Sequence, residues 1–170
     1  MAEPPDFDRL FRSVTRSAVH LEMRDDYGGS SPAFAAWRER RPYDRSRPDA
    51  AWHALVGGVV ERGVAVRRAR IVSVPASDYI RFEYEVTPAA NIAAGEHVRW
   101  LSRQHASDLA LPGNDFWLFD GTAVLFNYFS GDGAPVGTEL VDESAVVKLC
   151  AAAFEAVWGR AVPHGEYRPA

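Results

Sequence analysis

Two aspartates, Asp115 and Asp120, flank four large apolar residues in the stretch DFWLFD. A pair of carboxylates can supply a general acid and a general base. Asp120, however, precedes Gly121 and lies between two runs rich in β-branched and aromatic residues. Asp-Gly between such runs is typical of the two-residue turn of a β-hairpin, because both positions favour a positive φ. The pattern therefore predicts a hairpin, and neither aspartate is needed for catalysis.

The run VRRAR places two arginines, Arg68 and Arg70, on one side of a predicted strand. Charged side chains within a strand need partners when they are buried. Glu83 and Glu96 are the candidate partners, and Arg99 lies on the neighbouring predicted strand. Such a network can either stabilise the fold or line a ligand cleft, and the structural role is our first interpretation.

A third group of candidate residues lies in the stretch RDDY, after the first predicted helix. Arg24 can hold a carboxylate or another anion through two parallel hydrogen bonds. It can equally cap a helix or pair with Asp25. If the protein binds a small molecule, we expect the cleft to be lined by Arg24, Tyr27, Arg70, Arg99, Asp115 and Trp117.

The most basic part of the chain is RERRPYDRSR, residues 38–47. A solvated surface is one interpretation, and contact with phosphate or an acidic partner is the other. Aromatic residues and arginines are enriched at protein–protein interfaces. The candidate partner-binding residues are Trp37, Arg38, Arg40, Arg41 and Tyr43, and Trp117 is expected to be a further exposed aromatic residue.

The sequence gives little support for a cofactor site, a metal site or a catalytic nucleophile. The chain contains no P-loop, dinucleotide-binding, GxSxG or HExxH motif, so we predict neither a cofactor nor a catalytic residue. No two of the five histidines share a helical spacing, which argues against a metal site. His97 and His105 flank a predicted strand and are expected at the surface. Cys150, the only cysteine, is expected to be a small buried hydrophobe on the last helix.

Composition narrows the class of protein. A chain of 170 residues, 47 % of them apolar, can bury one core, so we expect one domain over residues 1–170. The net charge of −4 makes direct nucleic-acid binding an unfavoured function. The acidic start MAEPPDFDRL has no signal-peptide pattern, and no long apolar run follows. We therefore expect a cytoplasmic protein without membrane contact.

The order of predicted elements indicates the fold class. Asp6 can cap a helix with an apolar stripe through Ala18, Ser31-Pro32 begins a second helix, and Asp49 can cap a third. These form a helical part, residues 1–63. Strands are predicted within 64–75, 96–103, 115–119, 122–129 and 138–141. The stretch SDYIRFEYEV is compatible with a strand or a helix, and a helix that Ser77 can cap is favoured; Asp142 can cap a last helix, which ends at Gly159. We expect an α/β or α+β fold, with N-terminal helices packed on a mixed sheet and a closing C-terminal helix.

Four segments resemble a known family. They are FDRLFRSVTRSAVHLEMRDDY, RARIVSVPASDYIRFEYEVTPAANIAAGEHVRWLSR, LALPGNDFWLFDG and FEAVWGRAVPHGEYRP, and together they resemble the actinobacterial family DUF6879. Members are often encoded beside Xre-type helix-turn-helix regulators. The resemblance implies an accessory or regulatory role with such a regulator, in a Streptomyces-like bacterium, and no established reaction. The alternative is a small-molecule sensor or an enzyme that uses the cleft described above.

The C-terminal half is also similar to the end of phospholipase-D-like domains. The similarity lies in a strand bearing FWLFDG, an outgoing strand and the helix FEAVWGRA. Those enzymes need an HxKxxxxD motif, but the only lysine, Lys148, has no histidine two residues before it. This similarity implies a degenerate fold of that type, which would bind a ligand without hydrolysing a phosphodiester.

Overall fold

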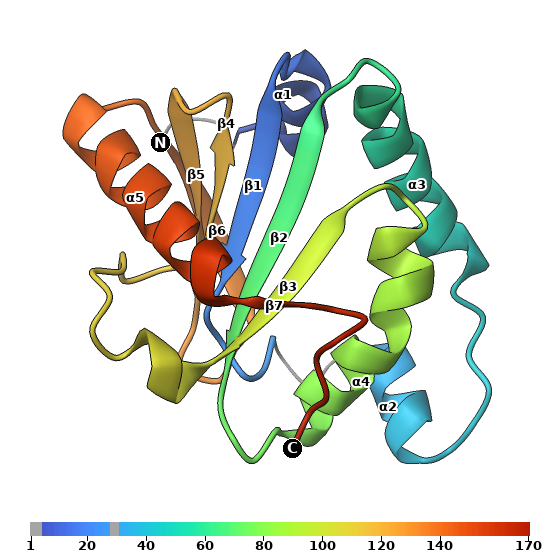
Figure 1. Ribbon diagram of the computed structural model, residues 1–170. Helices are drawn as coiled ribbons and strands as arrows, with labels where there is room; N and C mark the ends of the chain where they lie inside the picture. The colour runs from blue at the N-terminus through green and yellow to red at the C-terminus, as the bar shows by residue number, and fades with distance from the viewer. Residues whose placement is uncertain (1–4, 28–30) are drawn as a thin grey trace.

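The computed structural model describes residues 5–27 and 31–170, and a seven-stranded mixed sheet lies at its centre (Figure 1). The strand order is β6-β5-β4-β1-β2-β3-β7. Strands β1, β2 and β3 are parallel to one another, and the other neighbours are antiparallel. The strands are β1 (Ser17–Glu22), β2 (Ala65–Val72), β3 (His97–Ser102), β4 (Phe116–Phe119), β5 (Ala123–Phe129), β6 (Pro135–Val141) and β7 (Val162–Pro163).

Helices cover both faces of this sheet. They are α1 (Phe7–Ser13), α2 (Pro32–Arg38), α3 (Ser46–Val60), α4 (Asp78–Thr87) and α5 (Ser144–Arg160), with a π-helical turn η1 (Pro88–Ile92) and a 3-10 turn η2 (Arg103–Ala106). The predicted caps of α1, α2 and α4 are confirmed, because Asp6, Ser31 and Ser77 each accept a hydrogen bond from the backbone N–H three residues later. Within the described residues, no helix has the length and apolarity needed to cross a membrane.

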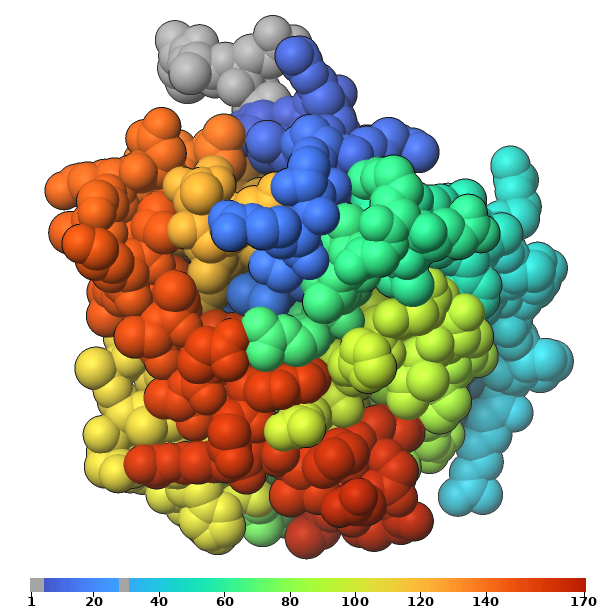
Figure 2. All heavy atoms as spheres, turned by 45° about the horizontal axis from the view of Figure 1, so that its top comes forward, coloured from blue at the N-terminus to red at the C-terminus, as the bar shows by residue number. Residues whose placement is uncertain are grey.

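Two apolar layers hold the helices on the sheet. On one face, α5 packs through Phe154 and Val157 against Leu21, Ile71 and Phe116. The other face carries two separate apolar clusters. One joins α1 and α3 to β4 and β5, and the other joins α4 to β3 and the C-terminal segment. Figure 2 shows that C-terminal segment, in dark red, packed against its yellow-green neighbours. The α/β class is therefore confirmed.

The expected extent of the first helix is wrong. Helix α1 ends at Ser13, and the residues from Ser17 form β1, which lies between β4 and β2. Because β1 is buried on both faces, Ala18, Val19 and Leu21 form a nearly continuous apolar run that can be mistaken for the end of a helical stripe. The part of the chain expected to be helical therefore contributes a central strand to the sheet.

Two helix boundaries also differ from expectation. Helix α3 begins at Ser46 and has Arg45 as its N-cap, without a side-chain capping hydrogen bond. The Asp44 carboxylate accepts the Ser46 N–H at 2.9 Å, and Asp49 pairs with Arg45 instead of capping the helix. Helix α5 begins after Glu143, whose side chain makes no capping hydrogen bond, so Asp142 is not its cap. A glycine within the last turn is tolerated, and α5 continues past Gly159.

The predicted hairpin is confirmed, but its connection is one residue longer than expected. Phe119 pairs with Ala123, so Asp120, Gly121 and Thr122 join β4 to β5, and Asp120 and Gly121 have φ values of 52° and 69°. The Asp120 carboxylate has a further role that the turn alone does not require. It accepts the backbone N–H groups of Thr15, Arg16 and Ser17 at 2.9, 2.7 and 3.0 Å. Asp120 therefore fastens the hairpin to the segment that leads into β1.

Replacement of Asp120 tests this fastening. We expect Asp120→Ala to lower the free energy of unfolding by about 2–3 kcal/mol, because it removes three acceptor contacts and places alanine in a left-handed conformation. Asp120→Asn retains one acceptor oxygen and tolerates the backbone, so its loss should be about 1 kcal/mol. Urea unfolding of the two variants measures both values. Equal losses would contradict a specific role for the hydrogen bonds.

Candidate functional site

A cluster of buried ions lies on the face of the sheet that α3 and α4 cover. Its centre is Glu22 at the end of β1. The Arg70 Nε donates to one Glu22 oxygen at 2.5 Å, and the guanidinium of Arg68 donates to the other. The parallel register places Glu22 beside Arg70 and His20 beside Arg68, so these four side chains share one face.

Further polar groups complete the partners of the two arginines. Glu96, which precedes β3, accepts from Arg68 Nε at 2.8 Å. The Asn91 amide and the Trp52 indole N–H also donate to Glu96, at 2.7 and 2.5 Å. Arg70 donates to the hydroxyl of Thr87 at 2.6 Å. The network therefore joins β1 and β2 to α3, α4 and η1.

Glu83 of α4 and His20 of β1 are the incompletely satisfied members of this cluster. The buried His20 Nδ1 lies 3.4 Å from Glu22 without a hydrogen bond among the described residues, and Glu83 is the one of the two that carries a carboxylate. Its buried Oε2 lies 3.5 Å from Arg70 Nε, yet it has no hydrogen-bond partner among the described residues. Burial raises the pKa of Glu83 to about 7; Arg70 opposes this shift and the charge of Glu22 adds to it. A carboxyl group that ionises near neutral pH therefore lies beside a buried guanidinium.

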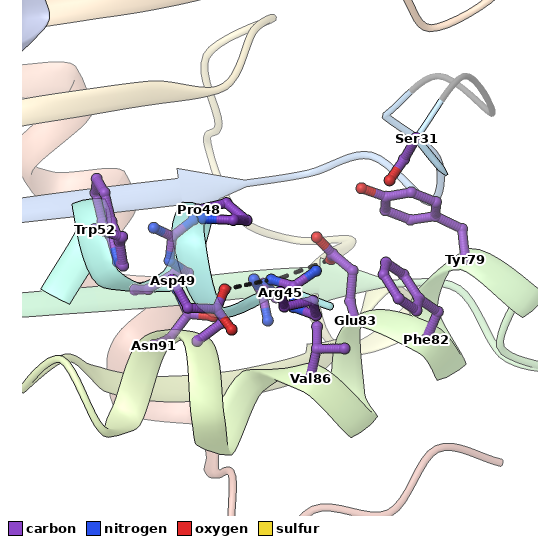
Figure 3. A pocket seen from close by; sticks show the side chains of 13 residues that line it. Ser31, Arg45, Pro48, Asp49, Trp52, Tyr79, Phe82, Glu83, Val86 and Asn91 are labelled. Atoms are coloured by element: carbon purple, nitrogen blue, oxygen red, sulfur yellow. Dashed lines mark hydrogen bonds and ion pairs between the residues drawn. The ribbon is translucent and has the colours of Figure 1, made fainter. Parts of the chain in front are cut away.

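A cleft opens above this cluster between the start of α3 and the length of α4. We call it the α3–α4 cleft, and its volume is about 330 Å³. Figure 3 shows Glu83 rising from α4 into the space between Arg45 and Tyr79, with Trp52 at the opposite end. Arg45 pairs with Asp49 at 2.9 Å, and its buried Nε has no partner among the described residues. Aromatic walls and converging polar groups are typical of ligand-binding sites.

Beneath the cleft, the ionisation states follow from burial and charge. Burial alone would raise the pKa of Glu22, but the charges of Arg68 and Arg70 outweigh it and hold that pKa below its usual range. Burial, with the charge of Arg68, lowers the pKa of His20 to about 3. His20 is therefore neutral at physiological pH, and its ring stacks on Trp117 at a centroid distance of 4.3 Å.

A second, smaller cavity lies at the carboxyl end of β1. It has a volume of about 190 Å³ and is lined in part by Arg24, Asp115 and Phe129. Asp115 accepts the Tyr27 hydroxyl at 2.5 Å and the Met23 N–H at 2.9 Å, so its carboxylate already has partners. Burial raises the pKa of Asp115 to about 6. This cavity is smaller than the α3–α4 cleft, and its one buried carboxylate is satisfied.

The residues predicted to line a ligand cleft do not form one site. Arg70 lines the α3–α4 cleft, whereas Arg24 and Asp115 line the smaller cavity and Tyr27 supports Asp115. Trp117 was expected to be exposed, but only 4 % of its surface is accessible and it lies under His20. Arg99 lies on the opposite face of the sheet, where its guanidinium stacks on Trp158 at 4.4 Å.

The predicted partner-binding residues lie together on α2 and the connection to α3. Arg38, Arg40 and Arg41 are exposed, and Tyr43 keeps 47 % of its surface accessible. Trp37 is half-buried, and its indole N–H donates to Glu85 at 2.7 Å. Figure 2 shows this connection, in cyan, at the margin of the molecule. The segment is therefore open to solvent and borders the cleft through Arg45.

The structure confirms some of the ion-pair partners predicted for the two arginines and adds others. Arg68 pairs with Glu96, and Arg70 lies near Glu83, as predicted. Glu22 was missed because β1 was not predicted, although His20 and Glu22 alternate with apolar neighbours as in a strand. We also did not predict that Arg45, Asp49 and Tyr79 line the cleft. The i, i+4 spacing of Arg45 and Asp49 is the one signal that points to their pairing.

Other candidate groups lie away from the cleft. Cys150 is fully buried on α5, where burial raises the pKa of its thiol to about 11, as expected of an inert core residue. His97 and His105 are exposed, as predicted. Within residues 5–27 and 31–170, no three histidine, cysteine, aspartate or glutamate side chains are grouped so as to hold a metal ion.

Comparison with known proteins identifies the family. A family model described as "Domain of unknown function (DUF6879)" matches residues 5–169. The chain therefore belongs to that family. No curated protein matches it.

Removal of the central carboxylate tests the ion cluster. We expect Glu22→Gln to lower the free energy of unfolding by about 3–5 kcal/mol, because it leaves two buried guanidiniums short of negative charge. Glu155 forms an exposed ion pair with Arg67 at 2.7 Å, and Glu155→Gln should cost at most about 1 kcal/mol. Urea unfolding gives both values. Similar losses in the two variants would contradict a central role for Glu22.

The raised pKa of Glu83 predicts a pH-dependent stability. Folding raises this pKa from 4.5 to about 7, so the contribution of Glu83 to stability is lost as pH rises through that window. Glu83→Gln cannot ionise, and its stability relative to the wild type should increase by up to about 3 kcal/mol between pH 5 and pH 8. Urea unfolding at the two pH values measures this difference. Asp115 titrates in both proteins, so its effect largely cancels, and a pH-independent difference would refute the assignment.

Proposed function

We propose that this member of the DUF6879 family is a non-catalytic regulatory protein that binds a small molecule in the α3–α4 cleft. One observation carries the proposal. The buried Oε2 of the Glu83 carboxylate accepts no hydrogen bond among the described residues, yet the carboxylate faces a cleft of about 330 Å³. A ligand that donates hydrogen bonds to Glu83 would remove this unfavourable state.

Physical chemistry favours a ligand over a purely structural cluster. Buried polar atoms in native proteins are nearly always hydrogen-bonded, and an exception calls for a specific explanation. Here the exception lies at the floor of an open cleft and not within a packed core. Trp52, Tyr79 and Phe82 supply apolar surface around it. Apolar walls with a few convergent polar groups are the usual composition of a small-molecule site.

The positions of the reactive side chains support binding without catalysis. Cys150 is buried on α5, across the sheet from the cleft, and Lys148 is exposed on the same helix. The hydroxyl of Ser31, at the edge of the cleft, accepts the Phe34 N–H as a helix cap. The similarity to phospholipase-D-like domains remains part of this proposal and implies a scaffold without the phosphodiesterase residues; β6 stands between the outgoing strand β5 and the helix α5.

A protein partner forms the second half of the proposed function. Arg38, Arg40 and Tyr43 are exposed on the segment that leads directly to Arg45 at the cleft. A ligand in the cleft would alter the surroundings of Arg45 and could thereby change the conformation of this segment. We propose that the segment contacts an Xre-type helix-turn-helix regulator in an actinobacterial, cytoplasmic setting, as the family resemblance implies.

Purification of the tagged protein from the cells that make it tests both halves. Native mass spectrometry should find the wild type with a bound small molecule and a helix-turn-helix protein. Val86 is half-buried and lines the cleft, so Val86→Trp should fill the cleft and abolish retention of the small molecule. The double variant Arg38→Glu with Arg40→Glu should keep the small molecule and lose the protein, because the charge of the segment is reversed.

The two variants serve as controls for each other. A wild-type protein that is purified alone and without ligand would contradict the proposal. A small molecule that survives Val86→Trp would place the binding site elsewhere. A protein partner that is retained at full occupancy by the double variant would exclude the segment from Arg38 to Tyr43 as the contact surface.

A further inference from the structure

We infer that the ligand of the α3–α4 cleft carries a planar cation, such as an amidinium or a guanidinium, attached to a flat apolar group, and that this cation pairs with Glu83. The inference rests on the proposed function, because it assigns the chemical class of ligand for the same cleft. It follows from the charges, the free hydrogen-bonding atoms and the walls of the cleft.

The charges in and below the cleft are not balanced. The guanidiniums are those of Arg45, Arg68 and Arg70, whereas the carboxylates are those of Glu22, Asp49, Glu83 and Glu96. One carboxylate is therefore in excess. The excess falls on Glu83, because each of the other three makes at least one short contact of 2.9 Å or less with an arginine. A cation on the ligand would restore neutrality inside a largely buried site.

An anionic ligand fits the same atoms less well. Arg68 directs all three of its guanidinium nitrogens at Glu22 and Glu96. Arg70 is held by Glu22 and Thr87. An anion would have to compete with carboxylates that are already in place, and it would meet the charge of Glu83. Arg45 offers a free Nε at the cleft, but its charge is already paired with Asp49 at 2.9 Å. The charge left without a close partner is the carboxylate of Glu83, whose natural complement is a pair of N–H donors.

The walls of the cleft match a flat body behind the cation. Phe82 and Tyr79 precede Glu83 on α4 and lie beside it, and Trp52 of α3 lies at the other end of the cleft (Figure 3). Their rings can cover the faces of a planar group, and aromatic rings also attract a cation placed over them. The hydroxyl of Tyr79 points into the same space in Figure 3. A planar cation can therefore reach Glu83 while its apolar part lies against Tyr79 and Phe82.

Binding of such a cation should be coupled to the release of a proton. Glu83 has a pKa of about 7, so part of the population is protonated at neutral pH. The charged or titratable groups around Glu83 are Glu22, Arg68 and Arg70 on β1 and β2, Asp115 before β4, Tyr79 on α4, Tyr27, and Arg45 with Asp49 at α3. Of these, Asp115 has a raised pKa of about 6 and is hydrogen-bonded outside the cleft. The affinity for the cation should therefore rise with pH, following the ionisation of Glu83.

Three probes of nearly the same shape can test the inference. Benzamidine is a planar cation, benzamide is its neutral analogue and benzoate is the corresponding anion. Each is titrated into the purified full chain while the indole N–H signal of Trp52 is followed by two-dimensional NMR. The titrations are repeated with Glu83→Gln, which preserves size and removes the charge, and with Val86→Trp, which fills the cleft. The NMR spectrum of each variant reports at the same time whether it is folded.

We expect benzamidine to bind at least about tenfold more tightly than benzamide or benzoate, because only benzamidine supplies two charge-assisted donors. Glu83→Gln should weaken the binding of benzamidine by about tenfold or more and leave the binding of benzamide nearly unchanged. Between pH 8 and pH 6 the affinity of the wild type for benzamidine should fall by about tenfold, whereas the variant should show no such change. Val86→Trp should abolish every response of Trp52.

The outcomes separate this inference from the proposed function. Equal or tighter binding of benzamide or benzoate, abolished by Val86→Trp, would overturn the cationic ligand and leave the cleft as a binding site. The absence of any response to benzamidine would also overturn the cationic ligand. Whether the cleft binds a small molecule would then be decided by the native purification described above. Because the comparison of the three probes uses the wild type, it decides the question even if Glu83→Gln does not fold.

Discussion

The structure depends on the ion pairs of Glu22 with Arg68 and Arg70 on the face of the sheet that α3 and α4 cover. The three side chains come from adjacent parallel strands and point to the same face. A slip of one residue between β1 and β2 would send Glu22 to the opposite face, among the apolar residues under α5, and leave two guanidiniums without their shared partner. Buried ion pairs add little net stability, but here the cost of mispairing sets the register at the centre of the sheet.

This polar cluster also determines where the helices can pack. The face of the sheet toward α3 carries one apolar cluster beside β4 and another beside β3, and the ions lie between them. Helices α3 and α4 each cover one apolar cluster. Because neither can cover the ions with apolar side chains alone, the α3–α4 cleft remains above them. The same charges that require polar partners thus produce the opening through which a ligand could supply one.

The unsatisfied state of Glu83 links this architecture to the proposed function. A polar network with an incomplete member is less stable than a complete one, since the low dielectric of the interior increases the cost of each missing hydrogen bond. Such a cost is tolerated at functional sites, where a ligand completes the network when it binds. Arg45 joins this site to the exposed segment that carries Arg38, Arg40 and Tyr43, and this continuity is the physical basis of the proposed link between ligand binding and a protein partner.

Local signals in the sequence determined the caps at Asp6, Ser31 and Ser77, the Asp120-Gly121 turn, the strands after Val64 and the need of Arg68 and Arg70 for acidic partners. Each of these depends on a few neighbouring residues, so a single sequence is enough to predict it. The tertiary structure alone decided that β1 is a central strand, that Glu22 bridges the arginines, and that Arg99 and Trp117 lie outside the cleft. The reason is that burial on both faces hides the strand pattern of β1, and which face a side chain occupies depends on strand order and register, which arise from contacts between residues far apart in the chain.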